Sequence, residues 1–234
     1  ERAWSEIARS MAVPRPGVFI EVLRACGALE VLLPEVDCLF GIPQPEKYHP
    51  EIDTGLHVLM TMNLAAREGR RPEVVFALLL HDLGKGITPR DQWPSHIGHE
   101  QKGVPLVRAV CDRFRAPSSY RDLAVRVAGM HLRCHRLLEM RPDTVMRLIE
   151  DADLMRRPQG VDDFLHACEA DFRGRKGLED RPYPQAERLR AALDAVLNVQ
   201  ARDLDMSGLE GKQVGEKLRR ARIEAIAGSA NPAA

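Results

Sequence analysis

Apolar residues recur every three or four positions along most of this chain, a spacing that predicts helices. No segment shows the sustained alternation of apolar and polar residues that is typical of a half-buried strand. The predicted helices cover residues 2–12, 17–29, 54–68, 98–115, 118–138, 142–156, 160–173, 184–200 and 212–227, and another begins at Pro72. The pattern therefore predicts an all-α fold.

The run from Val74 to Leu80 is entirely apolar, and periodicity alone does not separate a buried helix from a buried strand there. Pro72 and Glu73 favour the helix, because proline suits the first turn and an acid is stabilised beside the positive end of a helix. The run is also too short to cross a bilayer, so an integral membrane protein is not expected.

The segment between residues 33 and 50 contains four prolines and predicts a connector. We therefore expect three parts: helices and the connector in residues 1–50, a main helical domain in 54–155, and a helical extension in 156–234.

The chain has 34 Lys and Arg residues and 34 Asp and Glu residues. This balance of charge argues against strong sequence-independent binding of nucleic acid. Only six of the cations are Lys; Arg suits phosphate binding, although a GC-rich coding bias is the preferred explanation of the excess. Five cysteines without a CxxC pair disfavour both a disulfide framework and an all-cysteine zinc site. With no signal segment at its start, the chain is predicted to be cytoplasmic.

The most informative residues are histidines and aspartates on separate predicted helices. His81 and Asp82 end the apolar run, where burial without partners would be costly and a divalent metal would compensate both side chains. His57, 24 residues earlier, shares a stripe with apolar residues, and Asp153 follows 71 residues after Asp82. A lone inward histidine is usually a core residue, but this combination predicts a metal site with ligands His57, His81, Asp82 and Asp153. The donors suit Ni, Mg, Mn, Co, Fe or Zn, and the sequence leaves the ion open.

This pattern resembles the HD-domain metal-dependent phosphohydrolases, in which a His, a His-Asp pair and a distant Asp hold a divalent ion. More narrowly, the chain resembles the C-terminal part of the bacterial CCA-adding tRNA nucleotidyltransferases of the proteobacterial multifunctional type. The strings that carry this resemblance are Glu1-Arg-Ala-Trp, Cys26-Gly-Ala-Leu-Glu-Val-Leu-Leu-Pro-Glu35, Phe40-Gly-Ile-Pro, His49-Pro-Glu-Ile-Asp-Thr-Gly-Leu-His57, His81-Asp-Leu-Gly-Lys-Gly, Trp93-Pro-Ser-His-Ile-Gly-His99 and Glu169-Ala-Asp-Phe-Arg-Gly-Arg175.

The resemblance implies neck and body helices in residues 1–50, an HD domain in 54–155 and a tail in 156–234 that contacts tRNA. It implies hydrolysis of 2′,3′-cyclic phosphates, 2′-nucleotides and other phosphomonoesters, with the tRNA 3′ end as a partner. The Gly-Ser pair and Asp-x-Asp site of the nucleotidyltransferase head are not found, and the chain starts without Met. We therefore expect a piece of a longer protein that does not add CCA by itself. The sequence does not fix the oligomeric state, and a homodimer is one option.

Within such a site Asp82 is predicted to be both a ligand and the residue that orients the attacking water, and Lys85 to neutralise charge on the phosphate. His99, His131 and His135 are candidates for a second metal or for phosphate contact. We expect one strongly held ion, with His99 and His131 lining the phosphate pocket. The remaining histidines are expected to be structural or exposed: His49, His96 and His166.

Two other functions compete with this interpretation. The arginines after residue 156, including Arg173 and Arg175, fit a tRNA-binding module whose HD site is secondary, although arginines on a helix are usually just solvated. HD similarity alone would also fit a hydrolase of dNTPs or an alarmone, which the neighbouring strings disfavour.

Overall fold

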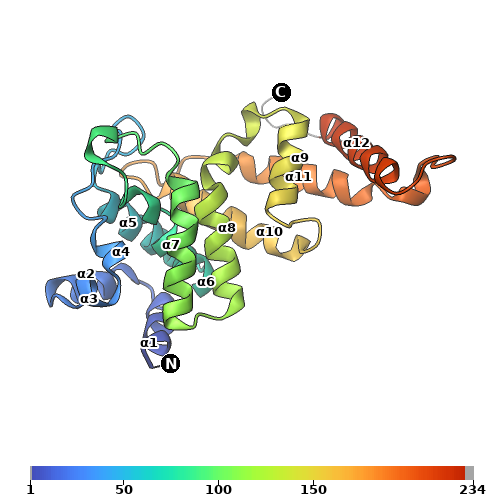
Figure 1. The fold of residues 1–234 in the computed structure, drawn as a ribbon. Coiled ribbons are helices and arrows are strands. Elements are labelled where there is room, and N and C mark those ends of the chain that lie inside the picture. Colours follow the sequence, from blue (N-terminus) through green and yellow to red (C-terminus); the bar gives the residue numbers. More distant parts are fainter. Residues whose placement is uncertain (1, 230–234) are drawn as a thin grey trace. The chain divides into compact units, whose positions relative to one another are not determined.

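The computed structural model describes residues 2–229, and all of the regular elements in that range are helices (Figure 1). Glu1 and residues 230–234, which the predicted segments include, lie outside the described range. The α-helices are α1 (Arg2–Met11), α2 (Gly17–Ala25), α3 (Ala28–Leu32), α4 (Pro34–Asp37), α5 (Thr54–Arg67), α6 (Pro72–Leu80), α7 (His99–Phe114), α8 (Ser118–His135), α9 (Pro142–Asp151), α10 (Val161–Arg173), α11 (Gln185–Asn198) and α12 (Lys212–Gly228). The predicted all-α fold is confirmed.

Helices α5 and α6 pack against each other and form the centre of the core. The Asp53 carboxylate caps α5 by accepting a hydrogen bond from the backbone N–H of Leu56. Every residue of α6 from Val74 to Leu80 is buried, which explains why the run shows no polar face. The Pro-Glu start therefore identified the structure of this run correctly: it is a helix.

Gly84 brings the end of α6 close to the start of α7. It lies in the short 3₁₀ helix Leu83–Lys85, and a Cβ atom on Gly84 would collide with the backbone carbonyl oxygen of His99. Gly103 on α7 lies against the same glycine. This close backbone approach, which only glycine allows, places the His81-Asp82 pair beside His99.

The chain divides into two compact units. The first contains the residues up to His131 together with Asp162–Pro182, and the second contains Leu132–Val161 and the residues from Tyr183 onward. The division differs from the three predicted segments, because α1 packs on α6 and α10 belongs to the same unit as α5 and α6.

In the second unit, α12 packs on α9 and α11. Arg219 on α12 makes two hydrogen bonds of 2.8 and 3.0 Å to the Glu150 carboxylate on α9. The buried Arg188 on α11 donates to the carbonyl oxygen of Ile226, near the end of α12. Arginine in this unit therefore holds helices together, in addition to any surface role.

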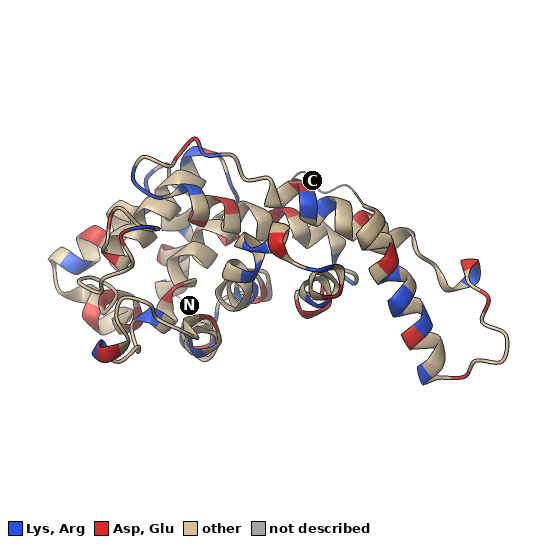
Figure 2. Ribbon diagram, turned by 90° about the horizontal axis from the view of Figure 1, so that it is seen from above, with Lys and Arg blue, Asp and Glu red and all other residues tan. Residues whose placement is uncertain are grey.

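Basic and acidic residues are interspersed along the described helices (Figure 2). This distribution agrees with the balanced charge of the sequence. No helix among the described residues is long and apolar enough to cross a membrane.

Candidate metal centre

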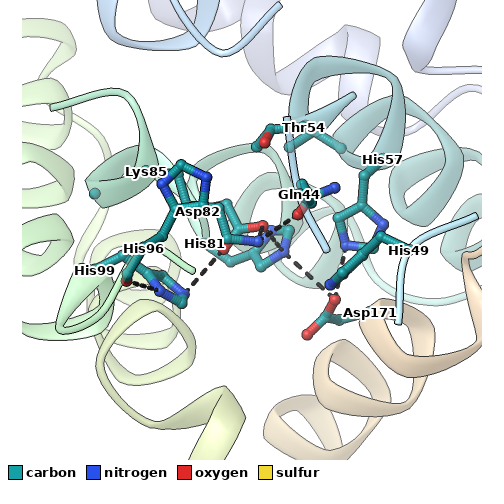
Figure 3. Close-up of polar contacts among 12 residues, drawn as sticks. Gln44, His49, Thr54, His57, His81, Asp82, Lys85, His96, His99 and Asp171 are labelled. Carbon is teal, nitrogen blue, oxygen red and sulfur yellow. Dashed lines mark hydrogen bonds and ion pairs between the residues drawn. The ribbon is translucent and has the colours of Figure 1, made fainter. Parts of the chain in front are cut away.

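Five helical segments of the first unit bring their chemistry-bearing side chains together inside the core (Figure 3). All of these side chains are buried, with at most 6% of any side chain exposed. The residues are His57 on α5, His81 and Asp82 at the end of α6, His99 on α7, His131 on α8 and Asp171 on α10.

The first cluster contains His57, His81 and Asp171. Oδ1 of Asp171 lies 2.9 Å from Nε2 of His57 and 3.5 Å from Nε2 of His81. Two imidazole nitrogens thus point at one carboxylate oxygen, an arrangement that suits a divalent cation.

The second cluster contains Asp82, His99 and His131. Oδ1 of Asp82 lies 3.3 Å from Nε2 of His99 and 3.8 Å from Nε2 of His131. The two Nε2 atoms are 3.5 Å apart. Asp82 also faces the first cluster, because its Oδ2 lies 3.2 Å from Nε2 of His81. Its two oxygens therefore join the two clusters.

The backbone fixes which nitrogen of each histidine is available to a metal. Nδ1 lies within hydrogen-bonding distance of a carbonyl oxygen in His81 (Leu78, 2.7 Å), His99 (His96, 2.9 Å) and His131 (Val127, 3.0 Å). A carbonyl oxygen only accepts, so Nδ1 carries a proton, and Nε2 is the nitrogen that faces the carboxylates and is left for a metal ion. Metal-bound histidines are commonly oriented by such a bond from the other ring nitrogen.

Among the described residues, three atoms of this centre are buried without a hydrogen-bond partner: Nδ1 of His57, Nε2 of His81 and Oδ1 of Asp82. A buried polar group without a partner costs on the order of 1–3 kcal/mol. A cation between His81 and Asp82 would satisfy the last two atoms at once. The donor set, which combines neutral imidazole with carboxylate, therefore fits a divalent metal ion.

A comparison with protein-family models matches residues 54–224 to the HD domain. The chain belongs to the HD domain family. This membership implies a metal-dependent hydrolase, in agreement with the donor set of the two clusters. The match begins at the residue where the sequence placed the HD domain and extends well beyond residue 155.

The chain is also similar to curated multifunctional CCA proteins. It is 57% identical to the protein of Thioalkalivibrio sulfidiphilus (strain HL-EbGR7), 50% to that of Nitrosococcus oceani and 50% to that of Pseudomonas aeruginosa, in each case over 97% of this chain. The chain spans about half the length of these relatives, 55%, 56% and 55% respectively. The resemblance seen in the sequence is confirmed.

The structure corrects the prediction that Asp153 completes the ligand set of the HD site. Asp153 lies in the second unit, its side chain is 42% exposed, and it pairs with Arg156 and Arg157. Its charge near the end of a helix is compensated by arginine. The distant aspartate that faces His57 is Asp171.

Asp171 carries a signal that the sequence interpretation missed. It lies three residues after Cys168 and seven after Phe164, and both of these are fully buried on α10. A carboxylate on a buried helical stripe needs a partner inside the core, whereas one at an exposed helix end does not.

Two further predictions involve residues outside both clusters. His135 belongs to the second unit, where Nδ1 lies 3.0 Å from the hydroxyl of Tyr183, and it is in neither cluster. Arg173 pairs with Glu68 at 2.8 Å, and Arg175, 8% exposed, donates to the carbonyl oxygen of Tyr48. Their guanidinium groups are thus engaged inside the first unit, and the RNA contact by these two arginines stays a prediction.

Lys85 is buried beside the HD pair. Its Nζ donates to Oδ2 of Asp82 at 2.7 Å and also to the side-chain oxygen of Gln44. Lys85 was predicted to lie within the metal site, and the structure places it beside Asp82. Gln44 was not predicted, because it lies in the connector, where no periodicity indicates which side chain turns inward.

The electrostatics of the centre are those of a cation site. Burial disfavours the charged imidazole of His81, but the carboxylates of Asp82 and Asp171 outweigh it and raise the pKa of His81 to about 10. Burial also opposes ionisation of Asp82, but His81 and Lys85 hold the pKa of Asp82 well below its usual value. Burial lowers the pKa of His131 well below its usual value, so His131 is neutral at pH 7.

We expect the affinity for a divalent cation to rise with pH between about 6 and 9. Since the pKa of His81 is about 10, a proton occupies Nε2 at neutral pH and must leave before the metal binds. One released proton corresponds to about a tenfold gain in affinity per pH unit. Calorimetric titration with Mn²⁺ or Zn²⁺ at several pH values in this range measures the affinity. A pH-independent affinity would contradict the expectation.

Proposed function

We propose that this chain is a metal-dependent phosphohydrolase that releases phosphate from 2′-nucleotides and opens 2′,3′-cyclic phosphates, as part of a protein that matures and repairs tRNA 3′ ends. One observation carries the proposal: three buried histidines, each with Nδ1 held by the backbone, direct Nε2 at Asp82 and Asp171. The similarity to multifunctional CCA proteins supports tRNA as the partner.

The residues that would hold the first ion are His57, His81, Asp82 and Asp171. A divalent ion there would polarise a phosphoryl oxygen and supply a water molecule with a lowered pKa. Asp82 would orient that water, because one of its oxygens faces each cluster. Lys85, held 2.7 Å from Asp82, would neutralise negative charge that develops on the phosphoryl group.

The geometry favours a second ion at Asp82, His99 and His131 over a pocket in which these histidines donate to phosphate. In both histidines a carbonyl accepts the proton of Nδ1, so either ring would need a second proton on Nε2 to donate to phosphate. A cation bound by the two Nε2 atoms, which lie 3.5 Å apart, needs no such proton. We therefore propose a two-ion centre in place of the single ion expected from the sequence.

Replacing His131 by alanine should reduce the bound metal from two ions per chain to one. The first cluster keeps all of its donors in this variant, so its ion should stay. Metal analysis after gel filtration, together with calorimetric titration, gives the number directly. One bound ion per chain in both the wild type and His131→Ala would contradict the two-ion centre and would favour phosphate contact as the role of His131.

The test of the proposed function is phosphate release by protein stripped with chelator and reloaded with Ni²⁺, Mn²⁺, Co²⁺, Mg²⁺ or Zn²⁺. We expect turnover of 2′,3′-cyclic AMP and 2′-AMP, and none with 3′,5′-cyclic AMP or dNTPs. The dNTPs serve as the control for the nucleotide-hydrolase alternative. Hydrolysis of dNTPs alone, or no turnover with any ion, would refute the proposal.

A further inference from the structure

Residues 43–53, which we call the strap, run from the connector to the start of α5 and are tied to the site at several points. The carbonyl oxygen of Pro43 lies 2.8 Å from Nε2 of His96. The side chain of Gln44 accepts a hydrogen bond from Lys85. The carbonyl oxygen of Tyr48 accepts one from Arg175, two residues after the end of α10. The strap therefore contacts residues on both sides of the buried clusters.

Glu51 is the residue of the strap that reaches the metal-binding histidines themselves. Its Oε1 lies 2.9 Å from Nδ1 of His57 and 3.0 Å from Nδ1 of His49 (Figure 3 shows both imidazoles). The side chain of Glu51 is 3% exposed and that of His57 is fully buried. The contact is thus sealed from solvent, where an electrostatic interaction is stronger than at the surface.

His57 differs from the other three histidines of the centre in what faces its Nδ1. His81, His99 and His131 each use a carbonyl oxygen three or four residues earlier in the chain. Among the described residues no backbone carbonyl accepts a hydrogen bond from Nδ1 of His57, and the oxygen that faces this nitrogen at 2.9 Å is Oε1 of Glu51, at ion-pair distance without a hydrogen bond in this geometry. Nε2 of His57 hydrogen-bonds with Oδ1 of Asp171, also at 2.9 Å. A single ring proton can lie at only one of these two carboxylates, so Glu51 bears directly on the choice of tautomer in His57.

We propose that Glu51 is a positioning residue: it accepts the Nδ1–H of His57 and so keeps the Nε2 lone pair of His57 directed at the first cluster. His49 is the second donor to the same carboxylate oxygen and holds Glu51 in place. A carboxylate behind a metal-bound histidine fixes the ring and makes it more basic. The role rests on the proposed metal site.

The ionisation states of Glu51 and His49 agree with these roles. Burial opposes ionisation of Glu51, but hydrogen bonds from His49 and His57 hold its pKa below the usual value, so it is a carboxylate at neutral pH. Burial lowers the pKa of His49 to about 4, so its ring is neutral there. A neutral His49 with its proton on Nδ1 is the donor that this arrangement requires.

The test compares Glu51→Ala with Glu46→Ala, which removes an exposed carboxylate of the same strap. We expect Glu51→Ala to weaken Zn²⁺ binding about 10–100-fold, measured by competition with a chromophoric chelator, and Glu46→Ala to bind like the wild type. Glu51→Gln keeps an acceptor oxygen without the charge, and it should recover most of the lost affinity. Unchanged affinity in a folded Glu51→Ala protein would overturn the inference.

Nitrogen-15 NMR of the histidine rings separates this inference from the proposed function. In the wild type Nδ1 of His57 should carry a proton with and without Zn²⁺, and this proton should exchange with solvent faster in Glu51→Ala. A deprotonated Nδ1 in the metal-free wild type would overturn the role of Glu51 whether or not the protein binds metal. Failure of the wild type to bind any ion, with Nδ1 protonated, would instead refute the proposed metal site.

Discussion

Replacing Asp82 by alanine is expected to abolish hydrolysis of 2′,3′-cyclic AMP and to remove metal from both clusters. Within residues 2–229, Asp82 is the carboxylate whose two oxygens face both sets of histidines, at 3.2 Å from His81 and 3.3 Å from His99. Loss of a direct ligand should exceed the roughly 10–100-fold effect of removing an outer partner. Phosphate release and metal content per chain measure the two losses.

The fold should survive this change, because Asp82 follows the end of α6 and caps no helix by its side chain. The substitution leaves Lys85 buried with only Gln44 as a partner, so some loss of stability is expected. Asp82→Asn preserves the volume and serves as a second variant, and Asp91→Ala removes an exposed carboxylate nearby in the sequence as a control. A folded Asp82→Ala protein with near-normal turnover and full metal content would contradict the assignment.

The fold could be predicted from the sequence because local signals at the helix starts agreed with the apolar pattern. Asp53 before α5 and Pro72 at the start of α6 lie where the capping and first-turn preferences place them. Even the all-apolar run of α6 was assigned correctly, because its flanking residues decided between helix and strand.

The histidine part of the site was also predictable, since a buried histidine on an apolar helix face needs a partner. His57, His81 and Asp82 lie where the pattern indicated, and His99 and His131 face Asp82. The carboxylates were harder. Glu51 lies in the strap, where the sequence has no periodicity. Asp171 lies on α10, which returns to the first unit after the chain has passed through residues 132–161 of the second unit.

The partners of two arginines could not be predicted for the same reason. Arg173 and Arg175 look like a surface pair in the sequence, but their partners Glu68 and Tyr48 lie more than 100 residues earlier. Nothing local indicates such long-range pairing. A cluster of arginines therefore predicts an RNA surface only when no buried carboxylate or carbonyl is near it in the fold.

The pair Asp171→Asn and Asp153→Asn decides which aspartate belongs to the centre. Asp171→Asn is expected to weaken binding of the first ion by more than about 100-fold and to remove most of the turnover, because its Oδ1 faces both His57 and His81. Asp153→Asn should bind metal and turn over substrate like the wild type.

The asparagine substitutions are matched, since both keep the shape of the side chain and remove one negative charge. Asp153 has a positive φ of 54°, which asparagine tolerates, and its ion pairs are exposed and contribute at most about 1 kcal/mol. Any loss in Asp153→Asn would therefore reflect a role in the site rather than misfolding. If Asp153→Asn lost its metal while Asp171→Asn kept both ions, the ligand set derived from the structure would be wrong and the one expected from the sequence would be restored.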